Sequence, residues 1–257
     1  MPQPTPQEHA GDQAHTGRLD RVLRWLDARI DVRELFGWVF SFTGLLYGEL
    51  DRRLDFREAL AKALKKPVPK HVNWLFCFGG ITFFLFTTQV ISGILLTLYY
   101  RPTPEVAYES VRHIMNNVTF GWLVRGIHQW AANLMILSVM IHMGRIFFMR
   151  AYRPPRELNW LTGVLLLVLT LGFGFTGYLL PWDQRAYWAT TVGTEMAGAV
   201  PFVGQYLLLI LRGGADVTGA TLARFYSGHV IILPAVIVIF LAAHFFMVRR
   251  QGISGPL

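Results

Sequence analysis

The sequence has 257 residues, of which 53% are hydrophobic and 16% are charged. This apolar share is too high for an ordinary soluble domain and is typical of a membrane protein. The formal net charge is +8, but the basic residues lie in short segments between apolar runs, a pattern that indicates membrane orientation and argues against nucleic-acid binding.

The N-terminal quarter is predicted to lie outside the membrane core. Residues 1–17 are polar and rich in proline and glutamine, which predicts a disordered tail without a cleavable signal peptide. Residues 18–71 are predicted to form interfacial amphipathic helices. Apolar residues at helical spacing over 18–34 predict the first, the short apolar run 35–50 suits an interfacial or re-entrant hairpin, and 51–71 is predicted to be a charged surface helix.

Four long apolar stretches follow, and they define a predicted all-α membrane domain over residues 72–257. Each exceeds the roughly 20 residues that cross a bilayer as a helix. Because open strand edges are not tolerated in lipid, all four are predicted to be helices. They run from about Val72 to Tyr100, Phe120 to Met149, Leu158 to Leu180, and Ala223 to Val248.

The basic residues predict the orientation of these spans. They are dense before the first span, between the second and third, and after the fourth, and sparser in the longer loops on the opposite side. By the positive-inside rule, both termini are predicted to be cytoplasmic. The arginine-rich loops and the Pro/Gln-rich tail favour a bacterial plasma membrane over a thylakoid.

The long loop between the third and fourth spans is not purely polar. It runs from Pro181 to Leu222 and contains Trp182, Tyr187, Trp188 and an apolar run at 202–211. We predict short amphipathic helices that lie on the outer membrane face and roof a binding cleft.

Four histidines lie within the predicted spans, where ionisable side chains are costly and usually functional. His128 and His142 belong to the second span, and His229 and His244 to the fourth. Separations of 14 and 15 residues place each pair roughly on one helix face, about 21 Å apart along the axis. Because the two helices run in the same direction, His128 is predicted to meet His229 near the outer side, and His142 to meet His244 near the cytoplasmic side.

Two bis-histidine sites stacked across a bilayer are what two six-coordinate b haems require, and filled axial positions suit the iron to electron transfer. The sequence therefore predicts a haem-binding bundle of four transmembrane helices. Zinc is disfavoured, because each site offers two nitrogens and no third ligand nearby. A lone histidine in a span could equally serve as a hydrogen bond between helices, but four in matched pairs argue against that interpretation.

Other residues in the spans fit a bulky cofactor. Gly79 and Gly93 in the first span and Gly177 in the third suggest that a large group approaches the backbone. Ordinary close helix packing explains any single glycine almost as well. Arg125 and Arg145 lie near the two histidines of the second span, where they can pair with haem propionates or with lipid headgroups.

Seven segments between residues 68 and 257 form an ordered set: VPKHVN, LFCFGGIT, FGWLVRGIHQW, RPPRELNWLTGV, FGFTGYLLPWDQ, TLARFYSGH and HFFMVRRQGISGPL. Together they resemble the cytochrome b/b6 family in its split form, whose N-terminal half is a separate chain. The resemblance covers about Pro67 to Leu257 and implies a fold of four transmembrane helices that ligate two haems. It also implies a subunit of a quinol–cytochrome c or plastocyanin reductase, which passes electrons from an outer quinol-oxidation site to a cytoplasmic quinone-reduction site with proton translocation.

The same resemblance implies a quinol site and partners. Tyr187 and Trp188, just after the PWDQ segment, would border the outer quinol site. A separate chain carrying the C-terminal helices of cytochrome b would complete that site. A Rieske iron–sulfur protein and a c-type cytochrome would complete a dimeric complex embedded in lipid.

Cys77, the single cysteine, has two interpretations. A lone cysteine in a membrane helix is usually a small apolar filler, and without a C-x-x-C-H motif a two-thioether haem is excluded. Cys77 matches a family cysteine that bonds a third haem through one thioether. The resemblance therefore favours a covalent haem at Cys77, at the depth of His142 and His244.

The sequence departs from the family pattern in two places. Gln129 stands where the family usually has arginine, which weakens a propionate contact there. About 30 extra residues, roughly 35–64, are expected to contact another subunit or to cap the cytoplasmic quinone site.

Two competing functions predict other features. A dihaem anchor of a hydrogenase or formate dehydrogenase would lack the PWDQ segment. A membrane scaffold or transporter would use the histidines only for structural hydrogen bonds.

Overall fold

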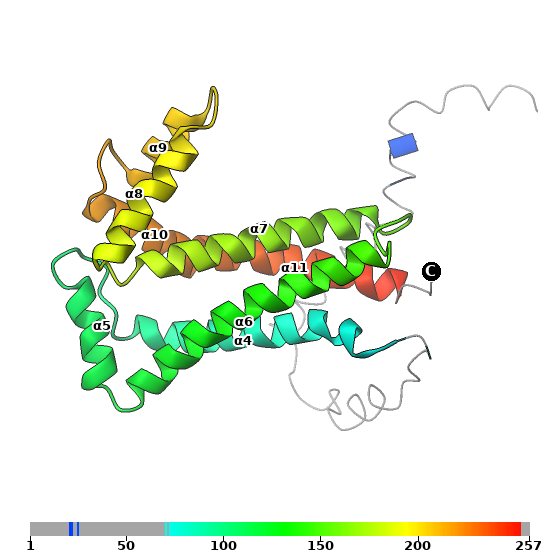
Figure 1. Ribbon diagram of the computed structural model, residues 1–257, viewed down its shortest axis with the longest axis horizontal. Coiled ribbons are helices and arrows are strands. Elements are labelled where there is room, and N and C mark those ends of the chain that lie inside the picture. Colours follow the sequence, from blue (N-terminus) through cyan, green and yellow to red (C-terminus); the bar gives the residue numbers. More distant parts are fainter. Residues whose placement is uncertain (1–20, 23–24, 26–69, 71, 253–257) are drawn as a thin grey trace, which may run out of the picture. The chain divides into compact units, whose positions relative to one another are not determined.

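The computed structural model describes residues 21–22, 25, 70 and 72–252 (Figure 1). The predicted tail at 1–17 lies outside the described residues, and so does nearly all of the predicted interfacial region at 18–71. These assignments remain predictions. Among the described residues, 72–152 and 159–252 belong to one compact unit, which contains the site described below.

Four helical segments are long and apolar enough to cross a membrane: Trp74–Thr97, Gly121–Phe148, Glu157–Leu179 and Gly219–Gln251. They differ from the predicted spans by a few residues at each end. Within the part of the chain that the structure describes, every regular element is helical. The predicted all-α architecture with four transmembrane helices is therefore confirmed.

The spans are built from continuous and composite helices. The first joins a 3-10 turn, η1 (Trp74–Cys77), to α4 (Phe78–Thr97). The second and third are α6 (Gly121–Phe148) and α7 (Glu157–Leu179). The fourth runs through α10 (Gly219–Ser227), the π-helical turn η2 (Gly228–Ile232) and α11 (Leu233–Gln251).

The spans associate as two antiparallel pairs, and α6 and α11 run in the same direction (Figure 1). The first pair is α4 with α6. In the second, α7 lies against the fourth span, with Gly163 near His244 and Gly177 near His229. Small side chains and glycines lie between the helices of each pair, which allows a close approach. An aromatic contact and a hydrogen bond are among the contacts that join the two pairs. Phe83 of α4 meets Phe245 of α11 edge to face at 5.0 Å between ring centroids, and the Tyr100 hydroxyl donates to the backbone carbonyl of Leu180 at 2.6 Å.

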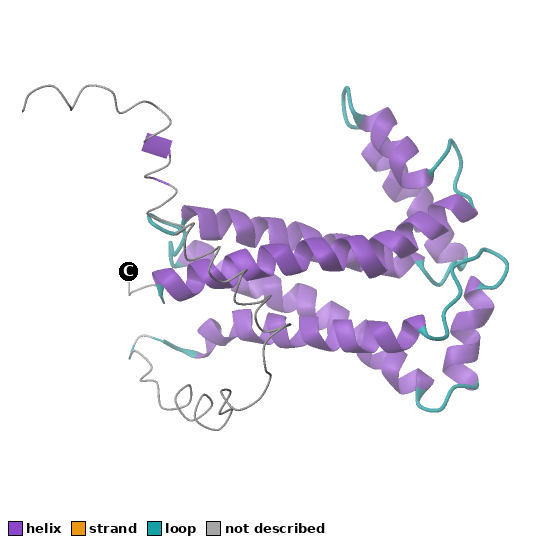
Figure 2. Cartoon of the chain, turned by 180° about the vertical axis from the view of Figure 1, so that it is seen from behind, coloured by secondary structure: helices purple, strands orange, loops and turns teal. Residues whose placement is uncertain are grey.

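Three further helices gather at one end of the spans (Figure 2). They are α5 (Ala107–Asn116), α8 (Gln184–Gly198) and α9 (Gly204–Arg212). The sequence predicts short helices between the third and fourth spans, where α8 and α9 lie, but it does not predict α5. The first turn of α8 is capped by Asp183, whose carboxylate accepts from the Ala186 amide at 2.8 Å.

Candidate functional site

His128 of α6 and His229 of η2 face each other across the two helix pairs. Their ring centroids are 6.5 Å apart, with the ring planes at 71°. Two metal–imidazole bonds of about 2 Å each, extended to the ring centres, span about 6 Å. The spacing therefore fits one iron held between the two rings.

Hydroxyl groups fix which nitrogen of these two rings is free. The Ser92 hydroxyl donates its proton to the carbonyl of Thr88 at 2.6 Å and lies 2.9 Å from Nδ1 of His128. The Thr176 hydroxyl donates to the carbonyl of Gly172 at 2.8 Å and lies 2.9 Å from Nδ1 of His229. With its only proton used, each hydroxyl accepts from an Nδ1–H, which leaves the Nε2 lone pair for a metal.

His142 and His244 form the second pair, toward the other end of α6 and α11, and their side chains are near enough to interact electrostatically. The Thr162 hydroxyl, which donates to the carbonyl of Asn159 at 2.9 Å, lies 3.3 Å from Nδ1 of His244. Nδ1 of His142 is buried and has no hydrogen-bond partner among the residues that the structure describes. The structure thus brings the four histidines together in the two pairs that the sequence predicts.

A glycine lies against each of the four imidazole rings. A Cβ atom at Gly79 would lie 3.0 Å from His142, one at Gly93 would lie 3.3 Å from His128, and one at Gly177 only 2.7 Å from His229. The fourth glycine, Gly163, which the sequence reasoning did not select, would place a Cβ atom 3.7 Å from His244. In all four cases the nearest ring atom is Cε1, so the same arrangement of glycine and imidazole occurs four times.

The π-helical turn η2 reconciles the unequal spacing of the histidines. His128 and His142 are 14 residues apart in a regular helix, whereas His229 and His244 are 15 apart. A π-helical turn takes up one extra residue, and η2 begins at Gly228, one residue before His229. Pro234, the second residue of α11, lacks the amide hydrogen that an α-helical bond would need there. The two pairs therefore keep a matching register.

The other residues predicted for this region take different positions. The Arg125 guanidinium lies 3.6 Å from the sulfur of Met115, and that of Arg145 lies 3.6 Å above the ring of Phe76. Both are half-buried on α6 and neither role is tested by these contacts. Cys77 is an exposed free thiol at the end of η1, two residues before the glycine that packs on His142.

Comparisons with known proteins identify the family of this chain. The sequence profile described as "Cytochrome b/b6/petB" matches residues 63–252. The chain belongs to the cytochrome b/b6 family. Cytochrome b6 of Tupiella akineta is 48% identical over 212 residues, covering 82% of this chain and 99% of that protein, and cytochrome b6 of Cyanidium caldarium is 49% identical over 211 residues, covering 82% and 98%.

A solved structure described as a hyperthermophilic respiratory complex III is similar with a TM-score of 0.71 and 32% identity. The match covers 91% of this chain and 56% of that one, so this chain spans little more than half of its length. Membership of the cytochrome b/b6 family makes the protein an integral membrane protein that binds b-type haem. It is an electron-transfer subunit of a multi-subunit quinol-oxidising complex. This confirms the family resemblance and the coarse function predicted from sequence.

In this member of the cytochrome b/b6 family, a surface hollow of about 470 Å³ lies beside the start of α8. It is lined by Tyr108 of α5 and by four consecutive residues, Trp182, Asp183, Gln184 and Arg185. Trp182, Asp183 and Gln184 belong to the PWDQ segment, in which Trp182 has a left-handed backbone conformation (φ 52°) that turns the chain from α7 into α8.

Tyr187 and Trp188 occupy the first turn of α8, next to this hollow. The Tyr187 ring packs edge to face against Trp182 at 6.1 Å and against Trp188 at 5.4 Å between centroids. Trp188 is 59% exposed, and its indole N–H donates to the Gln184 side chain at 3.2 Å. Trp188 is thus an exposed aromatic side chain beside the half-buried Trp182 and Tyr187, at the end of the spans that carries His128 and His229.

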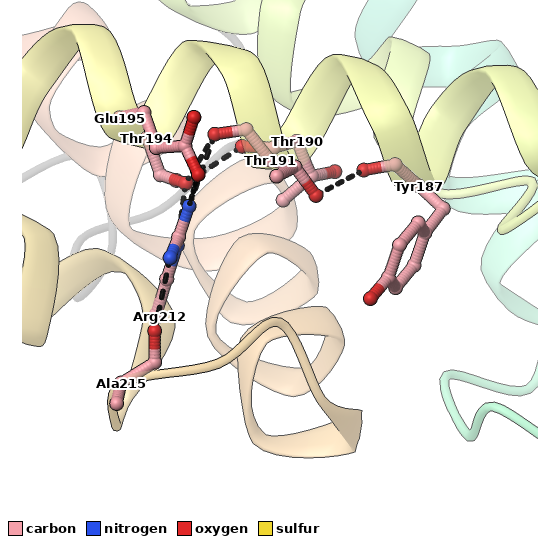
Figure 3. Close-up of polar contacts among 7 residues, drawn as sticks. All are labelled: Tyr187, Thr190, Thr191, Thr194, Glu195, Arg212 and Ala215. Atoms are coloured by element: carbon pink, nitrogen blue, oxygen red, sulfur yellow. Dashed lines mark hydrogen bonds and ion pairs between the residues drawn. The ribbon is translucent and has the colours of Figure 1, made fainter.

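A buried arginine fixes α8 relative to α9 (Figure 3). Arg212, at the end of α9, is only 7% exposed, and all of its donor nitrogens are engaged. Its guanidinium donates to the Thr194 hydroxyl at 2.7 Å, to the carbonyls of Ala215 and Thr191 at 2.9 and 3.0 Å, and to the Glu195 carboxylate at 3.3 Å. Sequence reasoning did not single out this arginine.

Proposed function

We propose that the chain holds two b haems and carries electrons between them across the membrane. The observation that carries this proposal is the pair His128 and His229, whose ring centroids are 6.5 Å apart and whose Nδ1 atoms each lie 2.9 Å from a hydroxyl. His142 and His244 would hold the second haem, about 21 Å further along the same two helices.

When bound, each bis-histidine haem supplies a one-electron redox centre with no open position for oxygen. The chain's own residues hold the four imidazoles at fixed heights, and the glycines let the rings sit close to the neighbouring helix. Arg125 and Arg145, one near each histidine of α6, would neutralise propionate charge. The competing dihaem anchor of another enzyme class has no support from the family match.

The quinol chemistry is proposed for the two ends of the spans. Tyr187 and Trp188 would border a quinol-oxidation site on the outer side, completed by a separate chain that carries the remaining helices of cytochrome b. Electrons would leave from there to a Rieske protein and a c-type cytochrome, and inward through the two haems to a quinone on the cytoplasmic side. This route releases protons outside and takes them up inside, with both termini cytoplasmic in a bacterial plasma membrane.

A third haem, covalently bound to Cys77, is part of the proposal. The thiol is exposed and stands two residues from Gly79, whose Cβ position lies 3.0 Å from the His142 ring. A haem attached there would lie at the depth of the inner pair and would connect that pair to the cytoplasmic quinone site.

The purified complex tests the proposal by its haem content and by electron transfer. Pyridine haemochrome analysis is expected to report two b haems per chain, and dithionite-reduced spectra to show b-type bands. His142→Leu should lose the inner haem and block re-oxidation of the outer haem across the membrane. His113→Leu, which changes an exposed histidine on α5, is the matched control and should keep both haems. A colourless complex, or normal transmembrane re-oxidation in His142→Leu, would refute the proposal.

A further inference from the structure

Three of the four glycines that pack on histidines are preceded by a hydroxyl residue. The dipeptides are Ser92-Gly93, Thr162-Gly163 and Thr176-Gly177. In each, the glycine faces Cε1 of an imidazole and the preceding hydroxyl lies 2.9 to 3.3 Å from Nδ1 of the same ring. In each dipeptide the glycine therefore leaves room for the imidazole ring, and the hydroxyl accepts a hydrogen bond from the Nδ1–H of that ring.

The fourth dipeptide breaks this pattern. Gly79 packs on His142 in the same way, with Cε1 as the nearest ring atom, but the residue before it is Phe78. Within the described part of the chain, the buried Nδ1 of His142 accordingly has no hydrogen-bond partner.

The difference has a direct consequence for ligands of iron. An imidazole whose Nδ1–H is donated to an acceptor is a more basic ligand, and a more basic ligand stabilises the oxidised, more positively charged iron. The His128–His229 pair has hydroxyl acceptors on both rings at 2.9 Å, whereas the His142–His244 pair has one at 3.3 Å and none on His142.

We propose that Ser92, Thr162 and Thr176 are positioning residues that lower haem midpoint potentials through the histidines they contact, and that Phe78 at the fourth position keeps the potential of the His142–His244 haem higher. Electrons then move downhill from the His128–His229 site to the His142–His244 site. This inference rests on the proposed function, because it requires both haems.

An isosteric pair of variants at position 78 tests the inference by redox titration of the purified complex. Phe78→Thr supplies the missing hydroxyl. Phe78→Val introduces a side chain of the same shape as threonine but without the hydroxyl. The inner haem of Phe78→Thr should be harder to reduce than that of Phe78→Val, by roughly threefold to tenfold in the reduction equilibrium, where tenfold corresponds to ~59 mV for one electron.

Thr176→Val tests the same idea in the opposite direction, and should make the outer haem easier to reduce by a similar factor. Ser138→Ala is the control, since the Ser138 hydroxyl bonds to Thr82 and to the carbonyl of Phe78 but to no histidine; neither haem should shift. Equal titrations of Phe78→Thr and Phe78→Val, or an unshifted outer haem in Thr176→Val, would overturn the inference while leaving two-haem binding intact. Missing b-haem bands in the unaltered complex would instead refute the proposed function itself.

Discussion

The guanidinium of Arg212 donates to the hydroxyl of Thr194 at 2.7 Å and thereby ties the end of α9 to the middle of α8. The Thr194 hydroxyl has already given its proton to the carbonyl of Thr190, so it can only accept. The backbone carbonyl of Arg212 in turn accepts from the Thr221 hydroxyl at the start of α10. One residue therefore holds three consecutive helices at the end that carries Tyr187.

Arg212→Met should loosen this end of the molecule. The substitution keeps an apolar stem but leaves buried carbonyls without donors, and the loss of such a network costs about 3 kcal/mol. We expect a lower melting temperature of the complex and faster proteolysis between α8 and α10. Arg112→Met is the control, because its pair with Glu109 at 3.2 Å is exposed on both sides and such pairs contribute at most about 1 kcal/mol. Equal effects of the two substitutions would contradict this role.

Gly177→Ala should reduce occupancy of the outer haem. The added methyl group would lie 2.7 Å from Cε1 of His229, a ring that the Thr176 hydroxyl already holds in place. The ring must shift, and the absorbance of the outer haem in reduced spectra should fall relative to that of the inner haem. Gly172→Ala, on the same helix, meets nothing within 4 Å and should leave both haems unchanged. Identical spectra for the two variants would show that the ring adapts.

The sequence predicted the spans and the histidine pairs because both depend on periodicity alone. Apolar runs of more than about 20 residues must be helical in lipid, and residues 14 or 15 apart return to nearly the same helix face. The pairing of His128 with His229 in space follows from an up-down arrangement of four helices.

Periodicity alone could not predict the hydroxyl partners of the histidines, the contact of Gly163 with His244, or the π-helical turn. The Ser92 and Thr176 acceptors become visible only once the neighbouring helix is placed against the histidine. A signal was nevertheless present, since the Ser/Thr-Gly dipeptide occurs in the first span and twice in the third, 14 residues apart in the latter. Arg212 gave no such signal, because an arginine that ends a surface helix is usually solvated.

Tyr100 should make the stability of the complex sensitive to alkaline pH. Its hydroxyl donates to Leu180, and burial, with a smaller contribution from Tyr226, raises the pKa of Tyr100 above its ordinary value of 10. The folded chain then holds this proton more tightly than the unfolded chain. Its contribution to stability is complete below pH 10 and is lost as the pH rises from there through the folded pKa.

Tyr100→Phe has no phenol proton to lose, so its melting temperature should fall less steeply above pH 10 than that of the unaltered complex. At neutral pH the variant should be less stable by about 1 kcal/mol, the contribution of one hydrogen bond. Tyr206→Phe, which changes a phenol that is 69% exposed, serves as the control. A stability difference between Tyr100→Phe and the unaltered complex that is constant across pH would argue against the link to Tyr100.

Cys77→Ser should abolish covalent haem while leaving the two b haems in place. Coordinate bonds from histidine do not survive denaturing electrophoresis, whereas a thioether does, so the unaltered chain should give a haem-peroxidase band near its mass of 29.2 kDa. The variant should give no band but should keep b-type absorbance. Maleimide labelling of the denatured chain provides the opposite readout, because a thiol consumed in a thioether cannot react. An unaltered chain that labels fully with maleimide and gives no peroxidase band would show that Cys77 carries no haem.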